Sequence, residues 1–84
     1  MDVQSTIKQY IVTEIMHELD QNVLDNEAAL IEGGIIDSMN LIKLVLFIEE
    51  KYGVAITDEE LDIDNFMTVN ALTKFVNKKI KSAG

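Results

Sequence analysis

The spacing of hydrophobic residues is the feature that most constrains the fold of this chain. In three segments these residues recur at every third or fourth position, which is the period of an amphipathic α-helix. No segment of any length alternates hydrophobic with polar residues, as a half-buried β-strand would. We therefore predict an all-α fold.

The three helical patterns occupy residues 3–18, residues 38–52 and the segment that follows Thr68. Gly53 can end the second helix in the left-handed conformation, and Thr68 can cap the last one. Thr57 and Glu60 fit a capping box, which predicts a short helix that ends near residues 62–65. We expect a four-helix bundle of three longer helices and one short helix. The residues expected to face its core are Val3, Ile7, Tyr10, Ile11, Ile15, Leu41, Leu44, Val45, Ile48, Tyr52, Val69, Leu72, Phe75, Val76 and Ile80.

Residues 19–36 form a long first loop, because the helical pattern is lost there. This stretch contains asparagine and aspartate and ends close after Gly33 and Gly34. Loops of this length are uncommon in compact domains and are often functional. We expect its hydrophobic residues to anchor it to the core: Val23, Leu24, Leu30, Ile35 and Ile36.

Length, cysteine content and charge limit what the domain can do. With 84 residues and no cysteine, the chain reads as one domain (1–84) that folds on its own hydrophobic core, and nothing requires more than a monomer. Its formal charge is −8, and all fifteen acidic residues lie at or before Asp64. Such a surface repels nucleic acid and attracts basic protein partners.

No hydrophobic run is long enough to span a membrane and no signal peptide is recognisable, so we expect a soluble cytoplasmic protein.

Two kinds of catalytic or metal site can be excluded from the residue pattern. A nucleophilic Ser38 would need a base, and the only histidine, His17, falls near the end of the first helix, where we expect it to be solvated. A calcium loop starting at Asp58 would need glycine and glutamate where Ile63 and Val69 stand. We expect neither catalysis nor a dedicated metal site.

The sequence Gly33-Gly34-Ile35-Ile36-Asp37-Ser38 describes a flexible loop that delivers a serine to the first turn of a helix. There the Ser38 hydroxyl would be exposed beside backbone N–H groups and the positive end of the helix dipole, which suits a phosphate ester. The alternative is that Asp37 and Ser38 only cap the helix.

A second hydrophobic stripe follows Ser38 on the same helix. Met39, Ile42 and Leu46 are spaced at i, i+3 and i+7, away from the face assigned to the core. From periodicity alone, this stripe either packs against the long loop or forms an exposed contact surface.

These residues resemble the phosphopantetheine-dependent carrier proteins, the acyl and peptidyl carrier superfamily. The resemblance rests on Gly34-Ile35-Ile36-Asp37-Ser38-Met39, on the helix from Leu41 to Tyr52, and on two later segments that begin at Tyr52 and Asn65. It covers nearly the whole chain in order and spacing.

The resemblance implies that a phosphopantetheinyl transferase attaches 4′-phosphopantetheine to Ser38 and that Asp37 assists through Mg²⁺. A cargo-loading ligase or adenylating enzyme and downstream transferases or synthases would then be its partners, and the chain itself would catalyse nothing. It further implies a recognition surface with a hydrophobic part, made by Met39, Ile42 and Leu46, and an acidic part, made by Glu49 and Glu50.

The chain also departs from the pattern of fatty-acid-synthesis carriers. Ile35 and Ile36 make two residues, rather than one, between the glycine and Asp37-Ser38, and Asn40 and Lys43 replace acidic residues. This form is more similar to free-standing carriers of specialised pathways, including the D-alanyl type, and favours amino acid or short acyl cargo. We expect Asn40 and Lys43 to discriminate between partners. The main alternative function is an unmodified helical interaction domain, in which Ser38→Ala would have little effect. A further alternative is an acidic phosphoprotein in which a kinase adds a single phosphate to Ser38.

Overall fold

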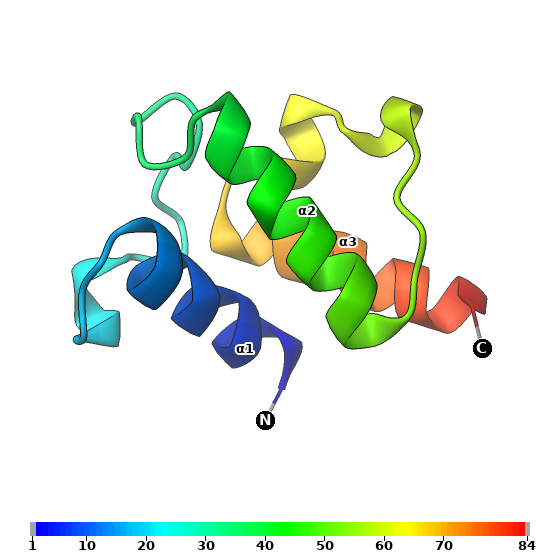
Figure 1. Cartoon of the computed structure of the whole chain (residues 1–84), viewed down its shortest axis with the longest axis horizontal. Coiled ribbons are helices and arrows are strands. Elements are labelled where there is room, and N and C mark those ends of the chain that lie inside the picture. The colour runs from blue at the N-terminus through cyan, green and yellow to red at the C-terminus, as the bar shows by residue number, and fades with distance from the viewer. Residues whose placement is uncertain (1, 84) are drawn as a thin grey trace.

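The computed structural model describes residues 2–83 and contains no β-strand in that range. Its α-helices are α1 (Val3–Tyr10), α2 (Ser38–Tyr52) and α3 (Val69–Ala83). In Figure 1, α2 crosses in front of α3, and the long first loop joins α2 at the top of the molecule. The first and last described residues lie toward the opposite end, so the start of α2 is remote from both. The predicted all-α class is confirmed.

The first helical segment is shorter than predicted and changes from an α-helix to a π-helix along its length. The Asp2 carboxylate caps α1 by accepting a hydrogen bond from the Ser5 N–H at 2.7 Å. After Tyr10 the chain continues as a π-helical turn (Ile11–Ile15), whose three hydrophobic residues are all buried. His17 then adopts a φ of 58°, and the Glu18 N–H donates to the Val12 carbonyl at 2.8 Å. This bond closes the helix end before residue 18 and leaves His17 exposed, as expected.

α2 begins and ends where predicted, because the residues that cap it, Asp37 and Gly53, act on the neighbouring backbone. Asp37 is the N-cap, and its carboxylate accepts a hydrogen bond from the Asn40 N–H at 2.8 Å. Gly53 ends the helix with a φ of 65°, a conformation that costs other residues more. The predicted cap of α3 is also present, since the Thr68 hydroxyl accepts from the Ala71 N–H at 3.0 Å.

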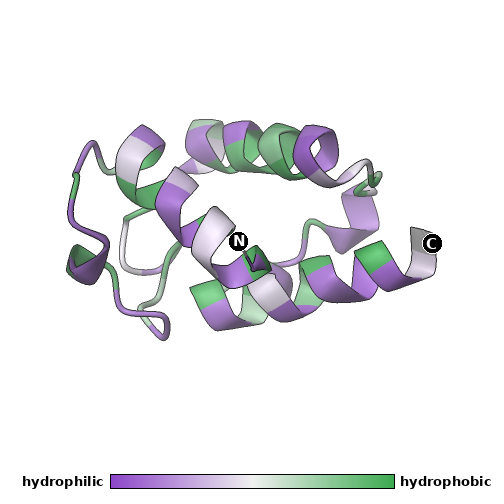
Figure 2. Ribbon diagram, turned by 90° about the horizontal axis from the view of Figure 1, so that it is seen from below, coloured by the Kyte–Doolittle hydropathy of each residue, from purple (hydrophilic) through white to green (hydrophobic). Residues whose placement is uncertain are grey.

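Hydrophobic side chains from the helices and the loops meet in one core. Figure 2 shows hydrophobic residues along each of the helices that surround it. Within the described residues no polar or charged side chain is buried. The rings of Tyr10 and Phe47 stack with centroids 4.1 Å apart and join α1 to α2. The buried residues are Ile7, Ile11, Val12, Ile15, Leu24, Leu30, Ile36, Leu44, Ile48, Val54, Phe66, Val69, Leu72, Phe75 and Val76.

The short helix expected after Thr57 is instead a pair of 3₁₀ turns, Asp58–Glu60 and Ile63–Phe66. The capping box at Thr57 is present as predicted. However, the Asp62 carboxylate accepts a hydrogen bond from the Asp64 N–H at 3.0 Å and starts a new turn. Between the first turn and Phe66 no side chain is buried, so there is little hydrophobic burial to stabilise a continuous helix.

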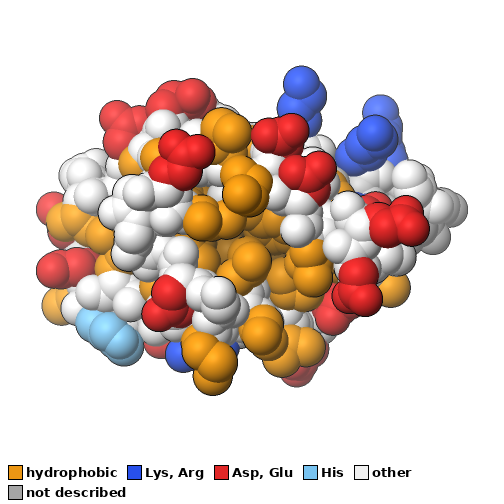
Figure 3. All heavy atoms as spheres, turned by 90° about the horizontal axis from the view of Figure 1, so that it is seen from above, with side chains coloured by type: hydrophobic (Ala, Val, Ile, Leu, Met, Phe, Trp, Pro, Cys, Tyr) orange, Lys and Arg blue, Asp and Glu red, His pale blue; other side chains and the backbone are white. Residues whose placement is uncertain are grey.

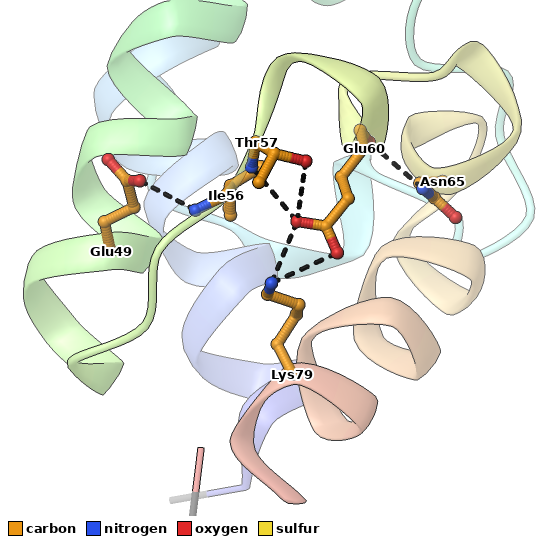
Figure 4. Close-up of polar contacts among 6 residues, drawn as sticks. All are labelled: Glu49, Ile56, Thr57, Glu60, Asn65 and Lys79. Atoms are coloured by element: carbon orange, nitrogen blue, oxygen red, sulfur yellow. Dashed lines mark hydrogen bonds and ion pairs between the residues drawn. The ribbon is translucent and has the colours of Figure 1, made fainter. Parts of the chain in front are cut away.

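Polar contacts hold this segment against α2 and α3 (Figure 4). The Ile56 N–H donates to the Glu49 carboxylate at 2.8 Å. The Glu60 carboxylate accepts from the Thr57 N–H at 3.0 Å and forms an ion pair with the Lys79 ammonium at 2.8 Å. The Asn65 side-chain amide donates to the Glu60 carbonyl at 3.0 Å. Glu60 therefore links its own turn, the following turn and α3.

The ion pair predicts how stability changes in acid. The Lys79 ammonium, followed by the Thr57 N–H, holds the pKa of the Glu60 carboxyl below its ordinary value of 4.5. Because this pKa is lower in the folded chain, Glu60 favours the folded state above its ordinary pKa, and this contribution is lost as pH falls through the folded value. We expect Lys79→Met to reduce the difference in melting temperature between pH 7 and pH 3.

The control for this measurement is Lys78→Met, which removes an equal charge from an exposed residue next to Lys79 that makes no ion pair within residues 2–83. Thermal unfolding followed by circular dichroism at both pH values compares the variants. Equal pH dependence in the two variants would show that the Glu60–Lys79 contact contributes nothing specific.

Candidate functional site

Ser38 occupies the first position of α2, directly after the N-cap, and its side chain is exposed. Within residues 2–83 its hydroxyl makes no hydrogen bond, and neither its own N–H nor that of Met39 has a partner. Two unpartnered N–H groups and the positive end of the helix dipole therefore lie at this position. The arrangement leaves the Ser38 oxygen accessible and favours negative charge beside it.

The long loop positions Ser38 through buried side chains and long-range backbone hydrogen bonds. Leu24, Leu30 and Ile36 are fully buried, as expected, whereas Val23 is 46% exposed and does not anchor the loop. Ile35 is half-buried and lies against the core.

Two backbone hydrogen bonds join the loop to residues around the start of α3. The Leu30 N–H donates to the Met67 carbonyl at 2.9 Å, and the Asn70 N–H donates to the Asn26 carbonyl at 3.1 Å. A third bond closes the loop on itself, from the Ile36 N–H to the Leu30 carbonyl at 2.9 Å. The segment that leads to Ser38 is thus fastened to the start of α3, although Asn70 lies 32 positions after Ser38 in the sequence.

The two adjacent glycines of the loop serve different local needs. A Cβ atom on Gly33 would overlap the carbonyl oxygen of Ala29, which accepts a hydrogen bond from the Gly33 N–H. Gly34 has a φ of 77°, which residues with side chains rarely adopt. Together they turn the chain tightly enough to bring Ile36 into the core two residues before Ser38.

Asp37 and Asn40 form the first turn around Ser38. One oxygen of the Asp37 carboxylate accepts from the Asn40 N–H, and the Asp37 carbonyl accepts from the Leu41 N–H at 2.8 Å. Asp37 is exposed, and its second carboxylate oxygen has no partner within residues 2–83. This side chain can therefore cap the helix and still offer an oxygen ligand beside the serine.

The structure decides between the two interpretations of the second hydrophobic stripe. Met39 is 73% exposed, Ile42 56% and Leu46 57%, so these side chains do not pack against the loop. Figure 3 looks onto the molecule from above Figure 1; hydrophobic side chains gather around a hollow at its centre, with acidic side chains around them. Besides Val23, sequence periodicity missed four further exposed hydrophobic residues, because they lie outside the α-helices: Leu19, Leu61, Ile63 and Met67.

The charged residues of α2 differ in exposure. Lys43 and Glu50 are exposed, whereas Glu49 is half-buried and binds the Ile56 N–H. Glu49 therefore has a structural role that the sequence did not indicate. Tyr10 of α1 stacks on Phe47 of α2. Burial of its side chain raises the pKa of Tyr10 above its ordinary value, and the charge of Glu14 adds to this shift.

Clusters of metal-binding side chains and membrane-spanning helices are both absent from the part of the chain that the structure describes. No group of three or more His, Cys, Asp or Glu side chains there could hold a metal ion. None of the helices between residues 2 and 83 is long and hydrophobic enough to cross a membrane.

Comparison with known proteins agrees with this geometry. Residues 5–76 match the family model for a phosphopantetheine attachment site. The chain belongs to the phosphopantetheine-dependent carrier proteins. The exposed, unbonded hydroxyl of Ser38 and the free N–H groups beside it fit a covalently bound phosphate group.

Several acyl carrier proteins are similar to this carrier along most of their length. One from Desulforapulum autotrophicum is 29% identical over 79 residues, which cover 94% of this chain and 99% of that protein. One from Buchnera aphidicola is 27% identical over 79 residues, covering 94% and 96%. One from Helicobacter hepaticus is 32% identical over 62 residues, covering 74% and 79%.

Family membership establishes the general activity. The protein is a carrier with covalently attached 4′-phosphopantetheine and is not an enzyme. Its family implies interaction with a phosphopantetheinyl transferase and with enzymes that handle acyl groups.

Gly33→Ala tests whether the tight loop is needed to position Ser38. Because the added methyl group would meet backbone rather than a movable side chain, we expect a loss of about 1–3 kcal/mol in the free energy of unfolding. Urea denaturation followed by circular dichroism measures this loss. Glu32→Ala, an exposed neighbour in the same turn, is the matched control and should change the unfolding free energy by less than about 0.5 kcal/mol. A similar stability for both variants would contradict the close approach at Gly33.

Proposed function

We propose that Ser38 is the residue that carries the 4′-phosphopantetheine. The observation that supports this most directly is its exposed and unbonded hydroxyl at the start of α2, directly before the exposed Met39. The Ser38 oxygen would form a phosphodiester bond as the pyrophosphate bond of coenzyme A breaks and adenosine 3′,5′-bisphosphate leaves. When bound, the group supplies a thiol that holds cargo as a thioester.

In this proposal each of the two carboxylate oxygens of Asp37 has its own function. One oxygen keeps the first turn of α2 in place through the Asn40 N–H. The other would engage the Mg²⁺ that accompanies the pyrophosphate of the donor, since carboxylate oxygen is a preferred ligand of this ion. The free N–H groups of Ser38 and Met39 would bind the phosphate oxygens of the product.

We further propose that Met39, Ile42 and Leu46 form the surface on which partner enzymes dock. Their exposure supports this role, because more than half of each of these residues is open to solvent. Glu50 would contribute the acidic part of the surface, while the internal hydrogen bond of Glu49 leaves less of its carboxylate for a partner. Asn40 and Lys43 lie on the same helix and would set which partners are accepted.

The similarity to acyl carrier proteins supports an acyl cargo over a peptide. Asn40 and Lys43 on α2 support a specialised pathway that uses short acyl or aminoacyl groups, loaded by a ligase or adenylating enzyme. We propose that residues 1–84 form a single carrier domain, that it acts as a monomer, and that it works in the cytoplasm.

The attachment site can be tested by intact-protein mass spectrometry. The protein is incubated with coenzyme A, Mg²⁺ and a phosphopantetheinyl transferase of broad specificity, beside Ser38→Ala. We expect one phosphopantetheinyl group on the parent and none on the variant. Ser5→Ala, which changes another exposed helical serine, is the control and should be modified like the parent.

Addition to Ser38→Ala would show that another residue carries the group. No addition to a folded parent would favour the alternative of an unmodified interaction domain that uses the same exposed stripe.

Lys43→Glu tests the proposed discrimination between partners. An enzyme of fatty acid synthesis that binds acidic carriers should accept this variant better, because a repelling charge becomes an attracting one. We expect an increase of about fivefold in kcat/KM for the loaded carrier, which corresponds to about 1 kcal/mol.

The control for Lys43→Glu is Lys51→Glu, which makes the same change of charge at an exposed position two turns further along α2. Because Lys51 is remote from the start of the helix, its replacement should change kcat/KM less. Equal effects of the two variants would show that only total charge matters and would remove Lys43 as a specificity residue.

A further inference from the structure

A hollow of about 300 Å³ lies beside Ser38, on the side of the long loop. It is separate from the exposed stripe, since none of Met39, Ile42 and Leu46 lines it. The residues that line it are Ile31, Gly34, Ile36, Asp37, Ser38 and Leu41.

The walls of this hollow are hydrophobic and already fixed by the fold. Ile36 is 1% exposed, and Ile31 and Leu41 are half-buried against the core. The place where a Gly34 side chain would stand is open, because no atom beyond Gly34 and its two chain neighbours lies within 4 Å of it, so the glycine keeps this part of the loop free of bulk. Asp37 and Ser38 provide the only polar side chains of the hollow.

The part of 4′-phosphopantetheine that lies nearest its phosphate matches the hydrophobic walls that lie nearest Ser38. Next to its phosphate stands one methylene group, followed by a carbon that bears two methyl groups; the polar amides come later. A phosphate on Ser38 would therefore bring the most hydrophobic part of the group within reach of the walls nearest that serine. Burial of methyl groups against isoleucine and leucine is favourable because it removes hydrophobic surface from water.

We propose that the hollow formed by Ile31, Ile36 and Leu41 is a resting site for the dimethyl portion of the pantetheine group. The proposal rests on Ser38 as the attachment residue. Ser38 itself lines the hollow, and the half-buried walls form a concave surface, whereas Met39 is 73% exposed. Ile31 and Leu41 thereby direct the group toward the loop and leave the docking stripe uncovered for partner enzymes.

Nuclear Overhauser effects test the proposal in the modified carrier. Mass spectrometry first establishes that Ser38 carries the group. In protein with labelled isoleucine and leucine methyl groups, we then expect cross-peaks from the pantetheine dimethyl protons to the methyl groups of Ile31 and Leu41. This measurement needs no mutation, so a change in folding cannot affect it.

A matched pair of variants sharpens the result. Ile31→Ala should lose most of the cross-peak intensity to Leu41, because one wall of the hollow is removed. Ile42→Ala removes a side chain of the same size from the stripe on the other side of Ser38 and should keep the intensity.

Two other outcomes would overturn the inference in distinguishable ways. In the first outcome, Ser38 is modified but the cross-peaks lead to Ile42 or to no methyl group of the protein. This result would reject the resting site and leave the proposal of Ser38 as the attachment residue standing. Ser38 unmodified by mass would reject the attachment residue and the resting site together.

Discussion

The burial of hydrophobic side chains in one continuous core is the interaction on which the rest of this structure depends. With no cysteine in the chain and no metal cluster among the described residues, burial is what holds the helices and the loops together. The core excludes every polar and charged side chain of residues 2–83. Loop residues such as Leu30 and Ile36 are as deeply buried as Leu44 and Ile48 of α2. The loop is therefore part of the folded body, and Ser38 is positioned by the same burial that stabilises the helices.

Local signals in the sequence were sufficient to predict the helices that matter for the site. Asp37 and Gly53 define the two ends of α2, and each acts through its own neighbouring backbone. The hydrophobic period of α3 likewise identified Leu72 and Val76 as buried. These features depend on residues only a few positions apart, so they can be read without knowing the fold.

Features that depend on distant contacts could not be read in this way. The hydrogen bond between Glu49 and the Ile56 N–H requires the chain to turn back after α2, and the sequence alone suggested only a surface role for this glutamate. The 3₁₀ turns after Thr57 arise because no side chain between the first turn and Phe66 is buried. The exposure of Ile63 and Met67 also depends on this irregular backbone, where helical periodicity gives no guidance. The hollow beside Ser38 joins Ile31 to Leu41 across the loop and has no sequence signature.

With Ser38 as the proposed attachment residue, the anchoring of Ile36 two residues before it has a consequence for the rate at which cargo reaches an active site. A serine on a mobile loop would add the motion of the loop to the volume that a tethered thioester explores. Here Ser38 is held by Ile36, which is 1% exposed, on one side and by the first turn of α2 on the other. Motion of the loop then adds nothing to the volume that the cargo explores, and the smaller this volume, the higher the effective concentration of cargo at a docked enzyme. A rigid pivot at Ser38 would therefore raise the share of brief encounters in which the cargo meets the active site.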